Sequence, residues 1–177
     1  MKVISINPKT NEIQTKDMQL QANSIYSFFS SILVDELVTL NKHRIYTDAN
    51  ALSQNKKAYM LGSQLLVGDA LIIGQNGLEE CDVSIQEDEV KELLNYDLPQ
   101  FYVDVLKILA DTDINLYKSF EVQKNGENIM LNTEWVLYTF NIADDKTKDY
   151  FITELKKSVD VESYIQKMAQ LAMNVAS

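Results

Sequence analysis

The chain contains few residues that crosslink, titrate near neutral pH or break regular structure. Its 177 residues include one cysteine, one histidine, two prolines and five glycines. A lone cysteine has no intramolecular disulfide partner, so no oxidising compartment is needed and we expect a cytoplasmic protein. The scarcity of proline and glycine argues against low-complexity or disordered segments, and most of the chain should therefore be ordered.

Long hydrophobic segments are also missing. The opening residues, MKVISINPKTNE, lack the run of about 7 to 15 apolar residues that marks a signal peptide, so we expect no export by that route. No stretch reaches the roughly 18 apolar residues of a transmembrane helix, and we expect no membrane association. A hydrophobic content of 46% is nevertheless enough to bury a core, in one domain or in one domain with a small appendage.

Basic residues are outnumbered by acidic ones, 16 against 26, which gives a formal charge of −10. Such a surface repels a phosphate backbone, so we expect no direct binding to nucleic acid. Solubility is the simplest interpretation of the charge, and lysines interspersed among the acids favour it. The alternative is a nucleic-acid mimic, whose carboxylates would occupy the basic groove of another protein.

Hydrophobic periodicity predicts an α+β fold with a mixed or antiparallel sheet, packed helices and a helical C-terminus. Strands are predicted at 3–6 and 12–15, at 37–40 and 44–47 around a turn at 41–43, at 70–73 between Gly68 and Gly74, and at 115–123 and 129–140. Helices are predicted at 25–33, 87–95 and 99–109, and 144–175 should hold two helices or one with a shift near Asp160. Pro99 suits a first helical turn, so we divide the chain into 1–95 and 96–177, with the second part either separate or packed onto the first.

Residue types that carry chemistry are sparse. His43 is predicted to lie exposed in a turn, and Cys81 follows Glu79-Glu80, whose charges disfavour a reactive thiolate. The glycines match neither phosphate-binding loop pattern. We therefore predict no catalytic residue, no cofactor and no metal, although Asp69, after Gly68, is a possible functional carboxylate as well as a turn residue.

Two further groups of residues have a structural and a functional interpretation. The acidic residues between 79 and 89 lack the central glycine of a calcium loop, so we interpret them as a solvated face and a helix start. The aromatic residues at strand spacing are expected in the core, with a partner-binding surface as the alternative. They are Tyr117, Phe120, Trp135, Tyr138 and Phe140.

A series of short motifs in residues 1–95 resembles a functionally uncharacterised family of small proteins from bacteriophages and bacterial mobile elements. The series is a strand at Met1-Lys2-Val3, DANALSQNKKA at 48–58, Gly62, GDALIIG at 68–74, and an acidic helix with Val90 and Leu94. The matching residues are Asn50, Leu52, Asn55, Gly68-Asp69 and Gly74. The resemblance ends near Asn95. It brings no established activity, and it implies an accessory protein that acts by binding a host or element-encoded protein.

These observations lead to three hypotheses. The first is a non-enzymatic protein-interaction protein of a phage or mobile element, of the accessory or anti-defence type, with a protein partner. The second is a small-molecule or nucleotide-binding domain, or a carboxylate-based enzyme, in which Asn50, Asn55 and Asp69 converge on one pocket. The third is the acidic nucleic-acid mimic.

Overall fold

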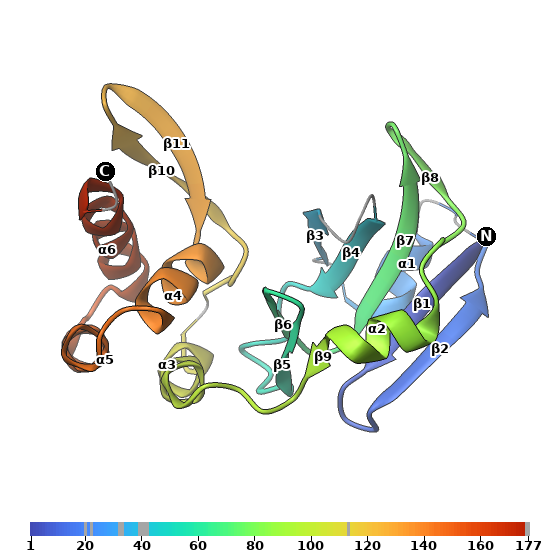
Figure 1. Cartoon of the computed structure of the whole chain (residues 1–177), viewed down its shortest axis with the longest axis horizontal. Helices are drawn as coiled ribbons and strands as arrows, with labels where there is room; N and C mark the ends of the chain where they lie inside the picture. Colours follow the sequence, from blue (N-terminus) through green and yellow to red (C-terminus); the bar gives the residue numbers. More distant parts are fainter. Residues whose placement is uncertain (20, 22, 32–33, 39–42, 113, 176–177) are drawn as a thin grey trace. The chain divides into compact units, whose positions relative to one another are not determined.

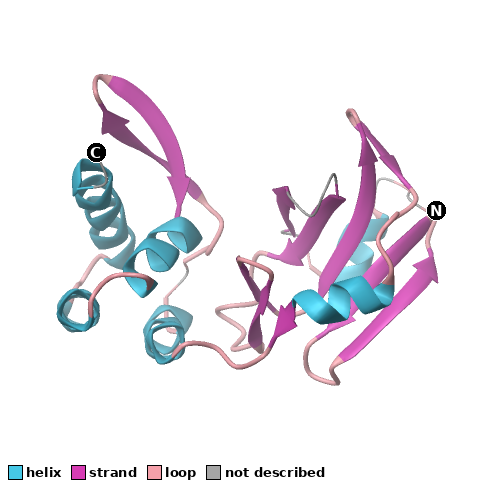
Figure 2. Cartoon of the chain, viewed as in Figure 1, coloured by secondary structure: helices cyan, strands magenta, loops and turns pink. Residues whose placement is uncertain are grey.

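The computed structural model describes residues 1–19, 21, 23–31, 34–38, 43–112 and 114–175. The chain divides into two units, Met1–Leu98 and Pro99–Ser177, close to the division predicted at residue 95. Strands dominate the first unit and helices the second (Figures 1 and 2). The predicted α+β class is confirmed, with antiparallel pairing between the described strands and helices at the C-terminal end.

In the described part of the first unit there are a six-stranded sheet, a three-stranded sheet and two short helices. The six-stranded sheet has the order β2-β1-β7-β4-β3, with β8 paired to β7, and the other has the order β6-β5-β9. The elements are β1 (Lys2–Asn7), β2 (Glu12–Asp17), α1 (Ser24–Phe29), β3 (Val34–Val38), β4 (His43–Asp48), β5 (Ala58–Leu61), β6 (Gln64–Val67), β7 (Ala70–Asn76), β8 (Glu79–Cys81), α2 (Glu87–Leu93) and β9 (Leu94–Asn95).

Both faces of the central strands are buried, which explains their near-continuous apolar sequence. Ile4 on β1, Ile72 on β7 and Ile45 on β4 are in register and fully buried, so they form one row across the sheet. Residues that alternate with this row, including Leu71 and Ile73, pack on the opposite face in a cluster with Phe29 of α1. Successive side chains of a strand point to opposite faces of the sheet, so a strand that is buried on both faces needs apolar residues at nearly every position.

Gly74 is needed at the point where three strands meet. It pairs with His43 on β4 and with Cys81 on β8. A Cβ atom at Gly74 would overlap the carbonyl oxygen of Asp82 and lie 2.9 Å from that of Cys81. Because both obstacles are backbone atoms, no side-chain rotation could relieve the contact.

Among the described residues, the second unit consists of a two-stranded hairpin and four helices. Its elements are α3 (Gln100–Ala110), β10 (Ser119–Lys124), β11 (Glu127–Asn132), α4 (Thr133–Asn141), α5 (Asp145–Lys157) and α6 (Val161–Val175). Phe151 of α5 is fully buried and contacts three rings, those of Phe101, Phe140 and Tyr164, at centroid distances of 5.8, 4.4 and 5.6 Å. These rings form the aromatic part of a core that also contains buried aliphatic side chains, such as Val105 and Leu155.

The predicted strand at 129–140 is wrong in its second half, which forms helix α4. The Asn132 side chain accepts a hydrogen bond from the Trp135 backbone N–H at 2.9 Å and so caps the helix. Val136 and Phe140 then share a buried face at helical spacing. The aromatic residues of this segment therefore do not share one face of a strand, and Tyr138 is 43% exposed on α4.

Several boundaries also differ from the sequence-based prediction. Helix α1 ends at Phe29, because Ser30 takes a left-handed conformation (φ 51°) that stops the helix, and Ile32 and Leu33, predicted to continue it, lie outside the described residues. The predicted turn residues Asn41 and Lys42 also lie outside them. The two C-terminal helices are confirmed, but Val159 is fully exposed between them.

Candidate functional site

A buried carboxylate at the end of β4 organises the loop that follows it. Asp48 is 3% exposed, and its Oδ1 accepts hydrogen bonds from the Ser31 hydroxyl at 2.9 Å and from the Asn50 backbone N–H at 3.0 Å. Its Oδ2 accepts from the Lys56 ammonium at 2.9 Å. Burial acts to raise the pKa of Asp48, but the hydrogen bonds from Lys56, Asn50 and Ser31 outweigh it and lower the pKa below its ordinary value.

The loop from Asp48 to Lys57 is held by tight turns and by a glycine on the neighbouring segment. Asn55 adopts a left-handed conformation (φ 54°), which asparagine tolerates better than most residues. Gly68 is also left-handed (φ 75°), and a Cβ there would lie 2.8 Å from Cδ of Lys56 and 3.0 Å from Cβ of Ala51. Its N–H donates to the Lys57 carbonyl at 2.9 Å, which fixes the Gly68-Asp69 turn beside the loop.

A cleft of about 530 Å³ opens between this loop and the turn that joins β1 to β2. Residues 7–9, 54–57, 68 and 69 line it, so it contains Lys9, Lys56, Lys57 and one carboxylate, Asp69. The lining therefore carries an excess of positive charge in a chain whose formal charge is −10. We call this feature the lysine cleft.

Two of its lysines are oriented by neighbouring groups. Lys56 donates to Asp48, while the Lys57 ammonium donates to Asn11 Oδ1 at 2.9 Å and lies 4.2 Å from the centroid of the Tyr96 ring. An ammonium has three N–H donors, so these contacts leave donors for a ligand. The arrangement holds two positive charges in place before anything binds.

Tyr96, whose ring lies beside Lys57, and the neighbouring Tyr59 each bury a hydroxyl group. The hydroxyl oxygens of Tyr59 and Tyr96 have no hydrogen-bond partner within the part of the chain that the structure describes, and the two rings are 5.7 Å apart. Burial raises the pKa of Tyr59, and Tyr96 and Asp69 raise it further. A buried polar atom without a partner costs free energy, which a water molecule or a ligand would recover.

The structure brings together two of the three predicted site residues. Asn55 and Asp69 both line the lysine cleft. Asn50 serves the loop instead, because its N–H donates to Asp48 and its carbonyl accepts from Ser53 Oγ at 3.0 Å. Asp48 and the lysines are not among the site residues predicted from the sequence. Aspartate after a strand commonly accepts the N–H of the residue two positions later in a turn, so the place of Asp48 after the predicted strand 44–47 is the signal that points to it.

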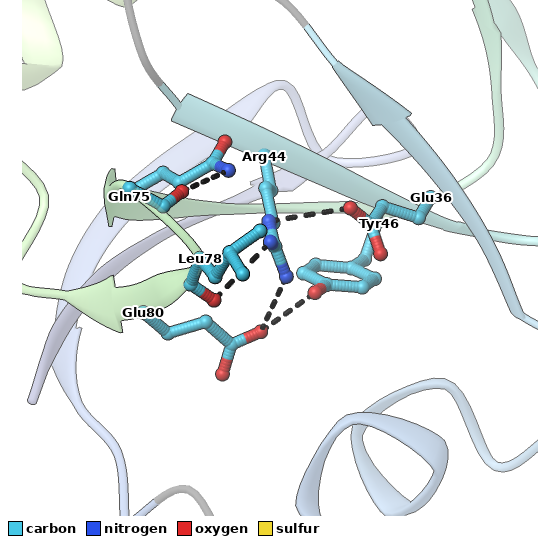
Figure 3. Close-up of polar contacts among 7 residues, drawn as sticks. Glu36, Arg44, Tyr46, Gln75, Leu78 and Glu80 are labelled. Carbon is cyan, nitrogen blue, oxygen red and sulfur yellow. Dashed lines mark hydrogen bonds and ion pairs between the residues drawn. The ribbon is translucent and has the colours of Figure 1, made fainter.

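In a second polar cluster, on β3, β4, β7 and β8, the polar groups contact one another (Figure 3). Arg44 Nε lies 3.2 Å from Glu36, Nη1 lies 3.8 Å from Glu80, and Nη2 donates to the Leu78 carbonyl at 3.4 Å. The Tyr46 hydroxyl donates to Glu80 at 2.6 Å. Burial, followed by this hydrogen bond, raises the pKa of Tyr46 to about 12. These contacts join strands that are distant in the sequence, which is a structural role.

The prediction of an exposed His43 is wrong. The residue lies in β4 and is 2% exposed, because the strand begins earlier than the polar sequence suggested. Its Nε2 accepts the Ser84 backbone N–H at 3.2 Å and is also 3.2 Å from the Ser84 hydroxyl. Both groups of one serine converge on the same nitrogen, so the pair fastens the segment after β8 to the sheet.

Three acidic residues in or near α2 accept backbone hydrogen bonds that join or cap elements of the first unit. Asp82 accepts from the Lys2 N–H at 2.9 Å, Glu87 from the Thr15 N–H at 2.6 Å, and Glu89 completes a capping box at the start of α2. Across residues 1–175, apart from those not described, no group of three histidine, cysteine, aspartate or glutamate side chains could hold a metal ion. Within the same described ranges, no helix is long and apolar enough to cross a bilayer.

In comparisons with known proteins, no family model, no curated protein sequence and no solved structure matches the chain.

Proposed function

We propose that the unit Met1–Leu98 is a non-catalytic, cytoplasmic binding module that holds an anionic group of a small molecule, a phosphate or a carboxylate, in the lysine cleft. The observation that carries this proposal is the convergence of Lys9, Lys56 and Lys57 on one cleft of an acidic chain. Amines from both walls of a concave surface favour an anion by charge and by hydrogen bonding.

The chemical groups that line the cleft explain why we propose that it binds the anion rather than catalyses a reaction of it. The polar groups of the lining are ammonium groups, amides and the carboxylate of Asp69. Lys56 donates to the buried carboxylate of Asp48 at 2.9 Å, and this contact fixes the position of its ammonium group beside the cleft. The left-handed turns at Asn55 and Gly68 give the cleft a fixed shape, which lowers the entropy lost on binding.

The test is a titration of the full chain with inorganic phosphate, AMP, ATP and citrate, followed by NMR chemical shifts. We expect at least one of these anions to bind, and Lys9→Gln and Lys57→Gln each to weaken it by about fivefold, since one charge-assisted hydrogen bond contributes on the order of 1 kcal/mol at an exposed site. Lys146→Gln, an exposed lysine of α5, is the matched control and should not change the affinity.

Equal affinity in the cleft variants and the control would contradict the proposal. The proposal would also be contradicted if no probe bound at concentrations up to about 10 mM. A dissociation constant above that value means that the free energy of binding is negligible at physiological concentrations of the anion. Raising the ionic strength should weaken binding, because the attraction is between charges near the surface.

A second proposal is contact with a protein partner, as expected for an accessory protein of a phage or mobile element. Leu78 favours it, since it exposes 91% of its surface at the tip of the β7–β8 hairpin, next to the left-handed Gly77. We expect a specific partner to be retained by the tagged chain at moderate salt and to be lost with Leu78→Ser. Retention of a basic, nucleic-acid-binding protein only at low salt would instead favour the nucleic-acid mimic.

A further inference from the structure

The β10–β11 hairpin of the second unit has two edges of different character. Its strands pair in register from Ser119 with Asn132 to Lys124 with Glu127, around a tight turn at Asn125 (Figure 2). In a two-stranded antiparallel sheet, alternate residues of each strand direct their backbone N–H and C=O groups away from the partner strand. Each edge therefore offers a row of hydrogen-bonding groups.

Helix α6 satisfies the outer edge of β10. The side-chain amide of Gln170 accepts from the Gln123 N–H at 2.9 Å and donates to the Gln123 carbonyl at 2.7 Å. Gln166 donates to the Glu121 carbonyl at 3.2 Å. The two glutamines thus take the place of a neighbouring strand, and this edge is closed.

The outer edge of β11 has no such cover. Gln123 and Glu121 point outward, so Asn128 and Met130, which lie opposite them, must also direct their backbone groups outward on the other side. No described residue forms a hydrogen bond with these outward groups of Asn128 and Met130. The Met130 side chain is 60% exposed. An uncovered, apolar edge is a template for pairing with another strand.

The charges along this edge point to the identity of the pairing strand. Residues 128–132, NIMLN, carry no charge, whereas the chain as a whole carries −10. At the edge of β2, by contrast, the carboxylate of Glu87 accepts the Thr15 N–H. Two copies of this chain repel each other over much of their surface, but β11 can meet β11 without placing like charges opposite each other.

We propose that β11 pairs antiparallel with β11 of a second copy of this chain, with the two-fold axis at Met130. In this register the two Met130 residues exchange both backbone hydrogen bonds, Asn128 faces Asn132 of the second copy, and Ile129 faces Leu131 of the second copy. The outward groups of the two strands are then directly opposite each other, as an isologous contact requires. The contact is independent of the lysine cleft and does not depend on the function proposed for it.

The dimer should be weak and favoured by salt. A contact centred on one pair of short strands buries less than the roughly 1,200 Å² of a stable complex, so we expect a reversible association. Screening the mutual repulsion of two acidic chains should strengthen it. This salt dependence is opposite in sign to that expected for anion binding in the lysine cleft.

Register-specific crosslinking of the full chain tests the proposal. With Cys81→Ser removing the native thiol, Met130→Cys should form a disulfide-linked dimer on mild oxidation, because paired Cα atoms about 5.5 Å apart are within disulfide range. Asn128→Cys is the matched control on the same edge. Its counterpart in the second copy lies four residues away along the strand, about 13 Å, so it should stay monomeric.

Sedimentation of the unmodified chain across concentration and salt gives the second readout. Met130→Lys should abolish self-association, since it brings two ammonium groups together at the axis, while Glu121→Lys on the closed β10 edge should retain it; circular dichroism checks that both are folded. A chain that is monomeric at every concentration, or a dimer that crosslinks equally at positions 128 and 130, overturns the proposal.

Discussion

The buried ion pair of the first unit should be much more important to stability than an exposed pair of the same length. Asp48–Lys56 and Asp88–Lys91 both have an N–O distance of 2.9 Å, but the Asp48 side chain is 2% exposed and that of Asp88 is 90% exposed. Asp48→Asn keeps an oxygen for its neutral donors and loses the ionic bond. Since hydrogen bonds to charged groups contribute about 1.5–3 kcal/mol and Lys56 can still reach water, we expect a loss of about 2 kcal/mol.

Asp88→Asn should cause no resolvable change, because exposed pairs contribute little. The single tryptophan, Trp135, lies in the second unit and does not report directly on β4. Native-state hydrogen exchange read by mass spectrometry is therefore the appropriate assay. We expect faster exchange in β4 and β7 for Asp48→Asn alone. Equal protection of β4 and β7 from exchange in Asp48→Asn and Asp88→Asn would refute the claim that burial determines how much an ion pair contributes to stability.

The pH dependence provides an internal check. Asp48 has a folded pKa below its ordinary value of 3.8, so the unfolded chain binds a proton first as the pH falls. Its contribution to stability is complete above that ordinary value and is lost as the pH falls through the folded pKa. Asp48→Asn should lack this component of acid destabilisation, which denaturant titrations at successive pH values would show.

Other substitutions test the packing and edge contacts. Gly74→Ala should destabilise the first unit by about 1–3 kcal/mol, through overlap with rigid backbone, whereas Gly62→Ala meets no atom within 4 Å and costs only the strain of its left-handed conformation; chemical denaturation compares the two. Tyr46→Phe removes the bond to Glu80 and should cost about 1 kcal/mol, and it should also remove from the ultraviolet titration a tyrosine with a pKa of about 12. Gln170→Ala exposes the β10 edge and should speed hydrogen exchange of the β10 backbone amides. Unchanged exchange would show that α6 covers the edge without that side chain.

Local sequence signals determined much of the architecture. The apolar runs at 3–6 and 70–73 are confirmed as strands, β1 and β7, and the Asn125-Gly126 pair is confirmed as a hairpin turn because both residues tolerate positive φ angles. The acidic first turn of α2 is also as predicted. Composition alone misled at α4, where aromatic and β-branched residues indicated a strand, but the cap at Asn132 and a helical burial pattern prevailed.

The candidate site was only partly predictable. Asn55 and Asp69 are candidates because they belong to the motifs that resemble the phage and mobile-element family, and the fold places both on the lysine cleft. What the sequence by itself determined is therefore the fold class and the position of most elements. Only the tertiary structure decided that His43 is buried, that Asp48 holds Lys56, and that the β10 edge is closed while the β11 edge is open. Each of these depends on contacts between residues far apart in the chain, and periodicity or composition, which are local, contain no information about such pairings.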